Sequence, residues 1–146
     1  MIVLDTTILF YAVTVGHEFS EASRALISGI ESGRLHATTT TEVIQEFAHA
    51  YSRRRARGET VRLSRHYAEL LAPLLSADRE QLDEGLRLFE RHAELGAFDA
   101  VLAAVARSTG AEALVSADAD FRVVPSLRHI EPATPAFDRL LAAERP

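Results

Sequence analysis

The sequence predicts an α/β protein in which helices cover both faces of a parallel sheet. Short apolar runs alternate along the chain with longer segments whose apolar residues recur every three or four positions. Strands of a parallel sheet are buried on both faces, so they read as continuous apolar runs, and helices connect them. The length of 146 residues suits one hydrophobic core, so we expect a single domain over residues 1–146.

Four segments are short, apolar and bounded by polar or turn residues, which is typical of strands buried in a sheet. The first is the Ile-Val-Leu run that ends at Asp5, and the second is rich in β-branched residues. The last is the weakest of the four. The predicted strands cover residues 2–4, 35–39, 113–116 and 127–130.

Helices are predicted where apolar residues keep a 3.6-residue period between capping residues. Thr40 or Thr41 can cap one helix at its start, and Gly33 is a plausible C-cap of the helix before it. Residues 8–13 either open a helix or form an apolar loop. The other predicted helices cover residues 20–32, 41–51, 61–74 with a break near Pro73, 78–95, 99–108 and 137–143.

The composition excludes several kinds of chemistry. There is no cysteine, so disulfides, thiolate metal sites and cysteine nucleophiles are ruled out. All 16 basic residues are arginine, so there is no phosphate-binding lysine of the P-loop type and no Schiff base. Any phosphate contact by a charged side chain must come from arginine, whose planar fork suits bidentate recognition.

Charge and hydropathy say less about function. The net charge of −5 argues mildly against non-specific nucleic-acid binding but does not exclude a nuclease, because acids that bind a metal lower the net charge. No apolar stretch approaches the roughly 20 residues that span a bilayer, and no signal-peptide pattern precedes the first strand. We therefore expect a cytoplasmic protein with no membrane association.

The most informative feature is a set of four acids that a parallel sheet would gather at one edge. Asp5 and Asp118 each follow a predicted strand, Asp99 begins a predicted helix, and Glu46 lies about one turn inside another. Sites in such sheets lie beyond the carboxyl ends of the strands, where the strand order switches. Carboxylates crowded without basic partners repel one another, so the set indicates a divalent cation. Oxygen ligands alone favour Mg²⁺ or Mn²⁺.

Each acid also has an ordinary structural explanation when it is taken alone. Asp99 can be a helix N-cap or a first-turn residue, and Asp5 can be a turn residue after a strand. Asp118 and Asp120 can form an Asx turn. Glu46 is harder to explain away, because it stands on a helix between Ile44 and Phe47 and is expected to be partly buried. Glu42, one turn earlier, fits a solvated first-turn acid or an outer member of the site.

The Arg-rich run over residues 53–57 has two interpretations. Cations at the end of a helix complement its dipole, which makes the run a solvated helix end. It can equally contact RNA phosphates. None of the six histidines has the spacing of a metal site or stands out as a general base.

Taken together, these motifs resemble a known family. The segments VLDTTILFYA, TEVIQEFAHAY, FDAVLAAVA and ALVSADADF are similar to those of PIN-domain ribonucleases, in particular the VapC toxins of bacterial toxin–antitoxin pairs. The resemblance runs from residue 2 to about residue 131. It places the family's metal-binding acids on Asp5, Glu46, Asp99 and Asp118. Asp120 is a secondary candidate, and Thr7 and Ser116 stand where the family commonly has other small polar residues.

The resemblance implies a fold, an activity and partners. The fold would be a three-layer α/β/α sandwich with a four- or five-stranded parallel sheet. The activity would be a Mg²⁺- or Mn²⁺-dependent endoribonuclease acting on structured RNA such as transfer RNA or ribosomal RNA loops. A VapB-like antitoxin would inhibit the protein, which would be a homodimer and would reach DNA only through the antitoxin.

Two rival functions remain open on the sequence. In an aspartyl phosphatase or receiver domain Asp5 would be a nucleophile, but those families pair it with a lysine, which this chain lacks. A non-catalytic interaction module would instead receive a partner's arginine in the acidic groove. Metal-dependent cleavage of RNA separates the second rival from the enzyme.

Overall fold

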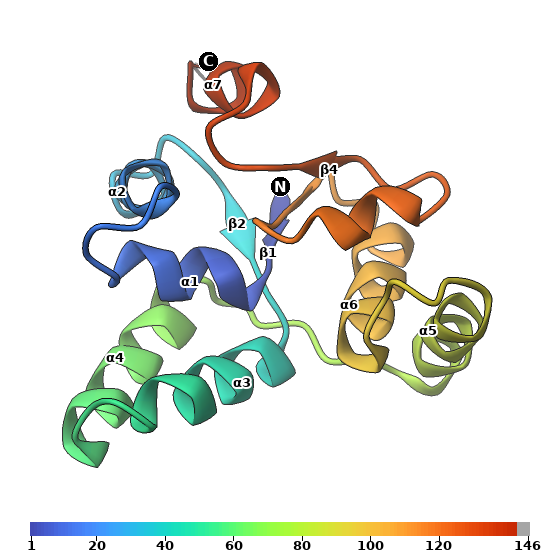
Figure 1. The fold of residues 1–146 in the computed structure, drawn as a ribbon, viewed down its shortest axis with the longest axis horizontal. Helices are drawn as coiled ribbons and strands as arrows, with labels where there is room; N and C mark the ends of the chain where they lie inside the picture. The colour runs from blue at the N-terminus through green and yellow to red at the C-terminus, as the bar shows by residue number, and fades with distance from the viewer. Residues whose placement is uncertain (143–146) are drawn as a thin grey trace.

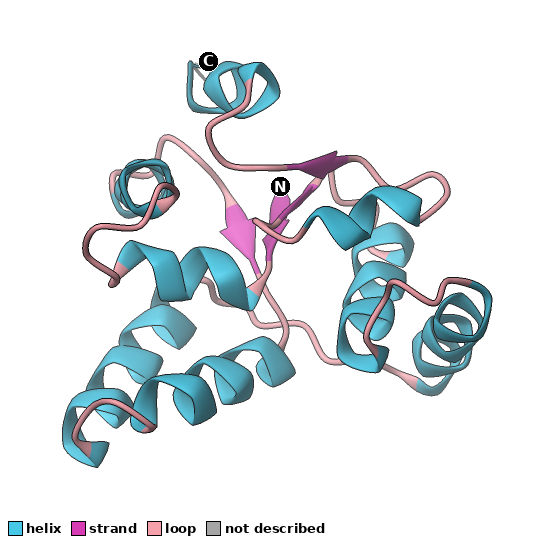
Figure 2. Cartoon of the chain, in the orientation of Figure 1, coloured by secondary structure: helices cyan, strands magenta, loops and turns pink. Residues whose placement is uncertain are grey.

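Four parallel strands form the centre of the computed structural model, which describes residues 1–142 (Figures 1 and 2). The strand order is β2–β1–β3–β4, and the strands are β1 (Ile2–Leu4), β2 (Ala37–Thr38), β3 (Leu114–Val115) and β4 (His129–Ile130). Val3 pairs with Thr38 on one side and with Leu114 on the other. The predicted parallel sheet is confirmed, with four strands.

Strands β2, β3 and β4 are shorter than predicted. Strand β4 covers His129–Ile130 instead of residues 127–130. Residues 35–39 and 113–116 were expected as strands, but regular pairing covers only two residues in each. The reason is that both pair with β1, which is itself three residues long. Thr39 is still held against the sheet, because its hydroxyl donates to the Leu4 carbonyl over 2.6 Å.

Seven α-helices and one short 3-10 helix surround the sheet in the described part of the chain. Of residues 8–13, left open between helix and loop, residues 8–12 belong to a helix and Val13 is its C-cap. The helices are α1 (Thr6–Ala12), α2 (Ser20–Glu31), α3 (Thr41–Ser52), α4 (Arg57–Leu70), α5 (Arg79–Arg91), α6 (Ala97–Ser108), η1 (Ala119–Val123) and α7 (Pro135–Ala142).

Local capping signals located several helix ends correctly. The Thr40 hydroxyl accepts a hydrogen bond from the Val43 amide at the start of α3. Gly33 follows α2 with a φ of +75°, a conformation that glycine adopts at little cost. Asp78 forms a capping box with Gln81 at the start of α5.

Two helices end earlier than predicted, and one predicted residue lies outside the described part. Helix α4 occupies residues 57–70 instead of 61–74, because Ala72 precedes Pro73 and that position disfavours helical backbone. Helix α5 stops at Arg91 instead of Leu95, since His92 is extended (φ −125°, ψ 97°). The predicted last helix over 137–143 is α7, of which residue 143 is outside the described residues.

The helices lie in layers on either side of the sheet, as a three-layer sandwich requires. In Figure 1, α1 and α2 lie to one side of the strands, whereas α6 lies to the other with α5 outside it. Helix α3 contacts both α1 and α4. Buried residues of the strands, with Phe47, Phe121 and Phe137 from the helices and η1, form the core. No helix within residues 1–142 is long and apolar enough to cross a membrane.

Helices α5 and α6 approach each other closely at Gly85. A Cβ added there would lie 2.7 Å from the Val101 Cα, which is closer than real Cβ atoms approach a backbone. The glycine therefore sets the distance between α5 and the helix that carries Asp99.

Replacing Gly85 by alanine should lower the free energy of unfolding by about 1–3 kcal/mol, because the added methyl group pushes the two helices apart. Chemical denaturation measures this directly. The matched control is Gly58→Ala in α4, where an added Cβ meets nothing within 4 Å and should leave stability unchanged or raise it by about 0.5–1 kcal/mol. Equal stabilities of the two variants would contradict the close packing.

Candidate functional site

The site lies where the chain reverses its direction across the sheet. From β1 the chain goes to β2 on one side, and it reaches β3 on the other side of β1 only later. Asp5 follows β1 and Asp118 follows β3, and the Asp5 amide donates to the Val115 carbonyl over 3.0 Å. The two acids therefore leave neighbouring strands at the switch point, where ligands bind in open α/β sheets.

Asp5 is buried, with 3% of its surface exposed, and it caps α1. Its Oδ2 accepts hydrogen bonds from the Thr7 hydroxyl and the Ser116 hydroxyl, each over 2.7 Å, and a longer one of 3.3 Å from the Thr7 amide. Its Oδ1 makes no hydrogen bond to any described residue. One oxygen thus fixes the side chain and the other stays available to a ligand.

The hydroxyls of Thr7 and Ser116 hold the loop after β3 against α1. They lie 3.3 Å apart, the Ala117 amide donates to Thr7 over 3.0 Å, and the Asp118 amide donates to Ser116 over 2.9 Å. The sequence indicated only that these residues keep a polar role. In the structure they support Asp5 and position Asp118.

Glu46 is exposed on α3, so the prediction that it is partly buried was wrong. The buried face of this helix is formed by Val43, Phe47 and Tyr51, and Glu46 stands at its border. The Thr6 hydroxyl donates to Glu46 Oε2 over 2.5 Å and holds the carboxylate beside the start of α1. Thr6 was missed by the sequence analysis, although its place directly after Asp5 was a signal.

Asp99 is the third residue of α6, and Gly96 is the N-cap of this helix. Burial is the largest of the causes that raise the pKa of its carboxyl from 3.8 to about 7. The negative charges of Asp5, Asp118 and Glu46 raise the pKa as well, and a hydrogen bond from the Gly96 backbone lowers it. The four acids therefore act on one another electrostatically.

A cavity of about 290 Å³ connects the four carboxylates. No basic side chain is among the described residues that line it, so nothing of the opposite sign compensates the acids there. Within residues 1–142, no three Asp, Glu or His side chains form a ready-made group that could hold a metal ion. The acids surround a shared space without forming a closed ligand shell. The lining residues are Asp5, Thr6, Thr7, Phe10, Tyr11, Glu46, Ala50, Asp99 and Asp118.

Two further acids considered in the sequence lie outside this cavity. Asp120 is exposed and does not line it, and its amide donates to Asp118 Oδ1 over 2.9 Å. Glu42 is exposed and lines a neighbouring apolar cavity of about 360 Å³, which also reaches Asp5, Glu46 and Asp99. The structure therefore places Asp118, and not Asp120, beside the other acids.

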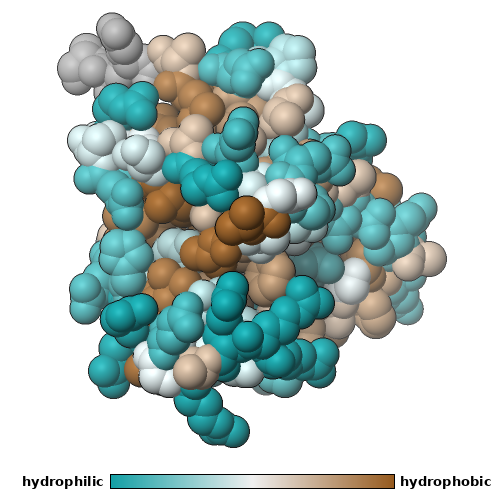
Figure 3. Space-filling view, turned by 60° about the vertical axis from the view of Figure 1, so that its left-hand side comes forward, coloured by the Kyte–Doolittle hydropathy of each residue, from teal (hydrophilic) through white to brown (hydrophobic). Residues whose placement is uncertain are grey.

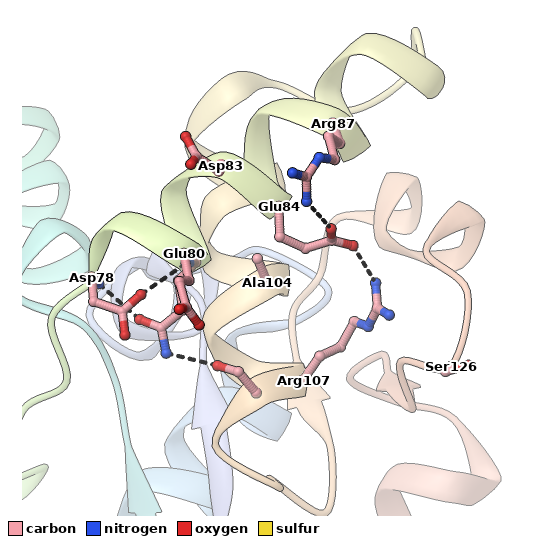
Figure 4. Close-up of a pocket in the computed structure, with 10 residues that line it drawn as sticks. Asp78, Glu80, Asp83, Glu84, Arg87, Ala104, Arg107 and Ser126 are labelled. Carbon is pink, nitrogen blue, oxygen red and sulfur yellow. Dashed lines mark hydrogen bonds and ion pairs between the residues drawn. The ribbon is translucent and has the colours of Figure 1, made fainter.

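A surface depression of about 810 Å³ between α5 and α6 is a separate and structural feature (Figure 4). Glu84 forms ion pairs of 3.3 Å with Arg87 and with Arg107, as the dashed lines in Figure 4 show. Gln81 donates to Ser108 over 2.7 Å across the same seam. Because Glu84, Arg87 and Arg107 are paired with one another across the two helices, we assign the depression a role in helix packing and not in chemistry.

A parallel sheet with uncompensated carboxylates at its switch point defines a class of protein, the α/β proteins whose site at that edge is suited to a divalent cation. The PIN domain family matches residues 2–127, and the chain belongs to that family. It is 43% identical to Ribonuclease VapC7 of Mycobacterium tuberculosis over 145 residues, which cover 97% of this chain and 98% of that protein. The predicted relationship to VapC ribonucleases is confirmed.

Solved structures share the fold at low sequence identity. VapBC2 of Rickettsia felis, bound to a DNA fragment from its promoter, gives a TM-score of 0.69 at 17% identity and covers 90% of this chain and 98% of its own. VapC20 of Mycobacterium tuberculosis, a toxin that cleaves the sarcin-ricin loop, gives 0.70 at 18% identity and covers 84% and 93%. These likenesses show a common fold.

Replacing Asp99 by asparagine should stabilise the metal-free protein, and more so at about pH 8 than at about pH 5. The raised pKa means that the folded protein keeps a proton that the unfolded chain has lost, so the wild type loses stability as pH rises from 3.8 towards 7. We expect a gain of roughly 1–2 kcal/mol at the higher pH, discounted because the site is open to solvent. Denaturation in EDTA measures it, and a gain that does not depend on pH would contradict the assignment.

Proposed function

We propose that this protein is a divalent-metal-dependent endoribonuclease that hydrolyses phosphodiester bonds in structured RNA, such as transfer RNA or ribosomal RNA loops. We further propose that it is the toxin of a toxin–antitoxin pair. The observation that carries the proposal is the convergence of Asp5, Glu46, Asp99 and Asp118 on one cavity without a basic side chain. Membership of the PIN-domain family and similarity to Ribonuclease VapC7 support the assignment of an RNA-cleaving activity.

The donor set fits Mg²⁺, or Mn²⁺, because it consists of carboxylate oxygens. Asp5, Asp99 and Asp118 would hold the ion, and Glu46 would contribute directly or through water. When bound, a divalent ion lowers the pKa of a water molecule and offsets the charge of the phosphodiester. The unbonded Oδ1 of Asp5 supports this assignment, as does the location of Asp118 at the cavity.

The chain's own residues orient the carboxylates and set their charge. Thr6 holds Glu46, and Thr7 with Ser116 holds Asp5, so two of the acids are fixed before any ligand binds. These neutral hydroxyls satisfy the carboxylates without cancelling their negative charge. The raised pKa of Asp99 means that a cation must displace its proton near neutral pH, which makes cation binding weaker as pH falls below about 7.

The partners follow from the same relationship. A VapB-like antitoxin would neutralise the enzyme, and DNA would be contacted only through that antitoxin. The VapBC2 complex, solved with a promoter fragment, supports a partner of this kind. We expect the protein in the cytoplasm, where its RNA substrates are. The binding-module alternative keeps the antitoxin contact but lacks the cleavage.

Purified protein should cut total bacterial RNA at discrete positions with Mg²⁺ or Mn²⁺, and EDTA should abolish the cuts. Sequencing of the new RNA ends identifies the target. Asp99→Asn should lower the rate by at least about 100-fold, because it removes a metal-binding oxygen. Asp118→Asn should have a similar effect.

Asp120→Asn is the matched control for Asp118, since it removes an exposed acid two residues away that does not line the cavity. It should retain activity. The reverse ranking of the two variants would move the metal-binding role to Asp120. Folded, antitoxin-free protein that leaves a broad RNA pool intact would favour the binding-module alternative.

We propose in addition that the protein is a homodimer whose interface includes the exposed apolar side chains beside the site. Leu82, Leu86 and Phe98 line the apolar cavity next to the acids and are 44%, 47% and 74% exposed. Large apolar side chains gathered at one place mark an interaction surface. A second copy on this surface would border the catalytic cavity.

Phe98→Ser should therefore shift the protein from dimer to monomer, because it removes the most exposed aromatic side chain of this surface. Light scattering measures the mass, which should fall towards the 16.0 kDa of one chain. Val15→Ser, which removes a 93% exposed apolar side chain elsewhere, is the control and should leave the mass unchanged. A wild-type protein that is monomeric at high concentration would contradict the homodimer.

A further inference from the structure

The Arg-rich run is part of a larger basic region at the end of the α3–α4 hairpin. Six arginines and one glutamate lie between residues 53 and 65, in a chain whose net charge is −5. All six arginines are exposed. We call this region the basic end, and its members are Arg53, Arg54, Arg55, Arg57, Arg62 and Arg65.

Most of this positive charge takes no part in holding the fold together. Within residues 1–142, the side chains of five of the six arginines form no hydrogen bond or ion pair, and Arg55 lies over the ring of Tyr51 at 6.0 Å. Several arginines elsewhere are paired, as Arg107 is with Glu84 and Arg122 is with Glu131. Charge concentrated without internal partners is free for an external anion.

Helix dipoles explain only part of the basic end. Arg53 caps the C-terminus of α3, where a cation is favourable. Arg57 is the first residue of α4, where the positive end of the α4 dipole is unfavourable to a cation. The interpretation as a solvated helix end therefore accounts for Arg53 and fails for Arg57.

A continuous surface leads from the catalytic cavity to the basic end. Glu46 and Ala50 of α3 line the cavity of the acids, and Tyr51 and Arg54 line a second cavity of about 270 Å³. Phe10 of α1 lines both cavities, so the two adjoin. Glu46 lies on α3, and Arg54 lies in the turn that follows the end of that helix at Ser52. An RNA strand that occupies the catalytic cavity can reach Arg54 without leaving this surface.

An aromatic pair stands beside this surface at the catalytic cavity. Tyr11 lines the cavity, and its ring stacks on His17 with 4.1 Å between centroids and 11° between planes. Phe19 meets Tyr11 edge-on at 5.7 Å. Both stacked rings are partly exposed. Figure 3, which turns this side of the molecule forward, shows apolar side chains gathered among polar ones. Partly exposed rings beside exposed arginines are the elements that bind unpaired RNA, through base stacking and phosphate contacts.

We infer that the surface between α1 and α3, from Glu46 to Arg54, is the path of the RNA strand next to the bond that is cut. Arg54, with Arg53 and Arg57, binds phosphates of the flanking nucleotides, and the Tyr11 ring stacks on an unpaired base. This inference rests on the proposed ribonuclease function and adds the substrate-binding residues to it. It favours substrates in which the nucleotides around the cut are unpaired, because only an unpaired base can stack on a side chain.

The test is the binding of a fluorescent, unstructured oligoribonucleotide of about 12 nucleotides to the Asp99→Asn protein with Mg²⁺, in which the RNA stays intact. Titrations at about 50 to 300 mM salt give the affinity and its salt dependence. Arg54→Gln should weaken binding roughly three- to tenfold and reduce the slope of log affinity against log salt by about 0.7, the value for one contact to a single strand. Arg91→Gln is the matched control, because Arg91 is an exposed arginine at the end of α5 whose side chain pairs with no residue within 1–142.

The aromatic part has its own variants. Tyr11→Leu should weaken binding without changing the salt slope, whereas Tyr11→Phe, which keeps the ring, should bind like the parent. Thermal unfolding shows whether each variant is folded. In the active protein, Arg54→Gln should raise KM for cleavage and leave kcat unchanged.

The result that overturns the inference is an Arg54→Gln protein with the parent's affinity and salt slope. If that variant instead loses binding to its antitoxin alone, the surface belongs to a protein partner. A parent that does not bind the oligoribonucleotide also overturns the inference. Binding that depends on Arg54, in a wild-type protein that cuts no RNA, supports an RNA-binding surface at Arg54 but overturns both the proposed enzyme and the path beside a cut bond.

Discussion

The pairing of β1 with β3 is the contact on which the candidate site depends. Val3 and Leu4 lie beside Leu114 and Val115, although more than 100 residues separate the two strands in sequence. This pairing puts Asp5 and the loop that carries Asp118 next to each other. After β1 the chain continues to β2 on one side of the sheet, and after β3 it continues to β4 on the other side. The crevice lies between these two connections. Pairing over two residues suffices because helices cover the strands and exclude water from their hydrogen bonds.

The same convergence creates an electrostatic cost that the structure offsets locally. Four carboxylates share one cavity, and the raised pKa of Asp99 reflects both its burial and the repulsion. Hydroxyl groups of Thr6, Thr7 and Ser116 hold the carboxylates in place without neutralising them. An arginine in the cavity would relieve the repulsion, but it would also occupy the place of a cation. The arginines are gathered instead at the basic end, so opposite charges occupy adjoining parts of one surface.

Local signals in the sequence predicted the elements well but placed some of their ends poorly. The Thr40 cap, the Gly33 turn and the Asp78 start each depend on residues within one helical turn. The apolar period continues beyond Arg91 as far as Leu95, which is buried although it is not helical. Leu95 is thus a buried residue outside a helix, and the apolar period alone does not distinguish it from a buried residue within a helix. Glu46 was misjudged for a related reason, because its apolar neighbours do not reveal that the crevice leaves it uncovered.

The sequence by itself determined which acids the protein has, that they follow strands or begin helices, and which family its motifs resemble. Tertiary structure decided which of them meet. Asp118 and Asp120 lie two residues apart after the same strand. The turn in which the Asp120 amide donates to Asp118 leaves Asp118 at the cavity and Asp120 exposed. Tertiary structure also decided that the basic end adjoins the cavity through Phe10. The physical reason is range: capping and periodicity act within a few residues, whereas these meetings depend on the packing of segments far apart in the chain.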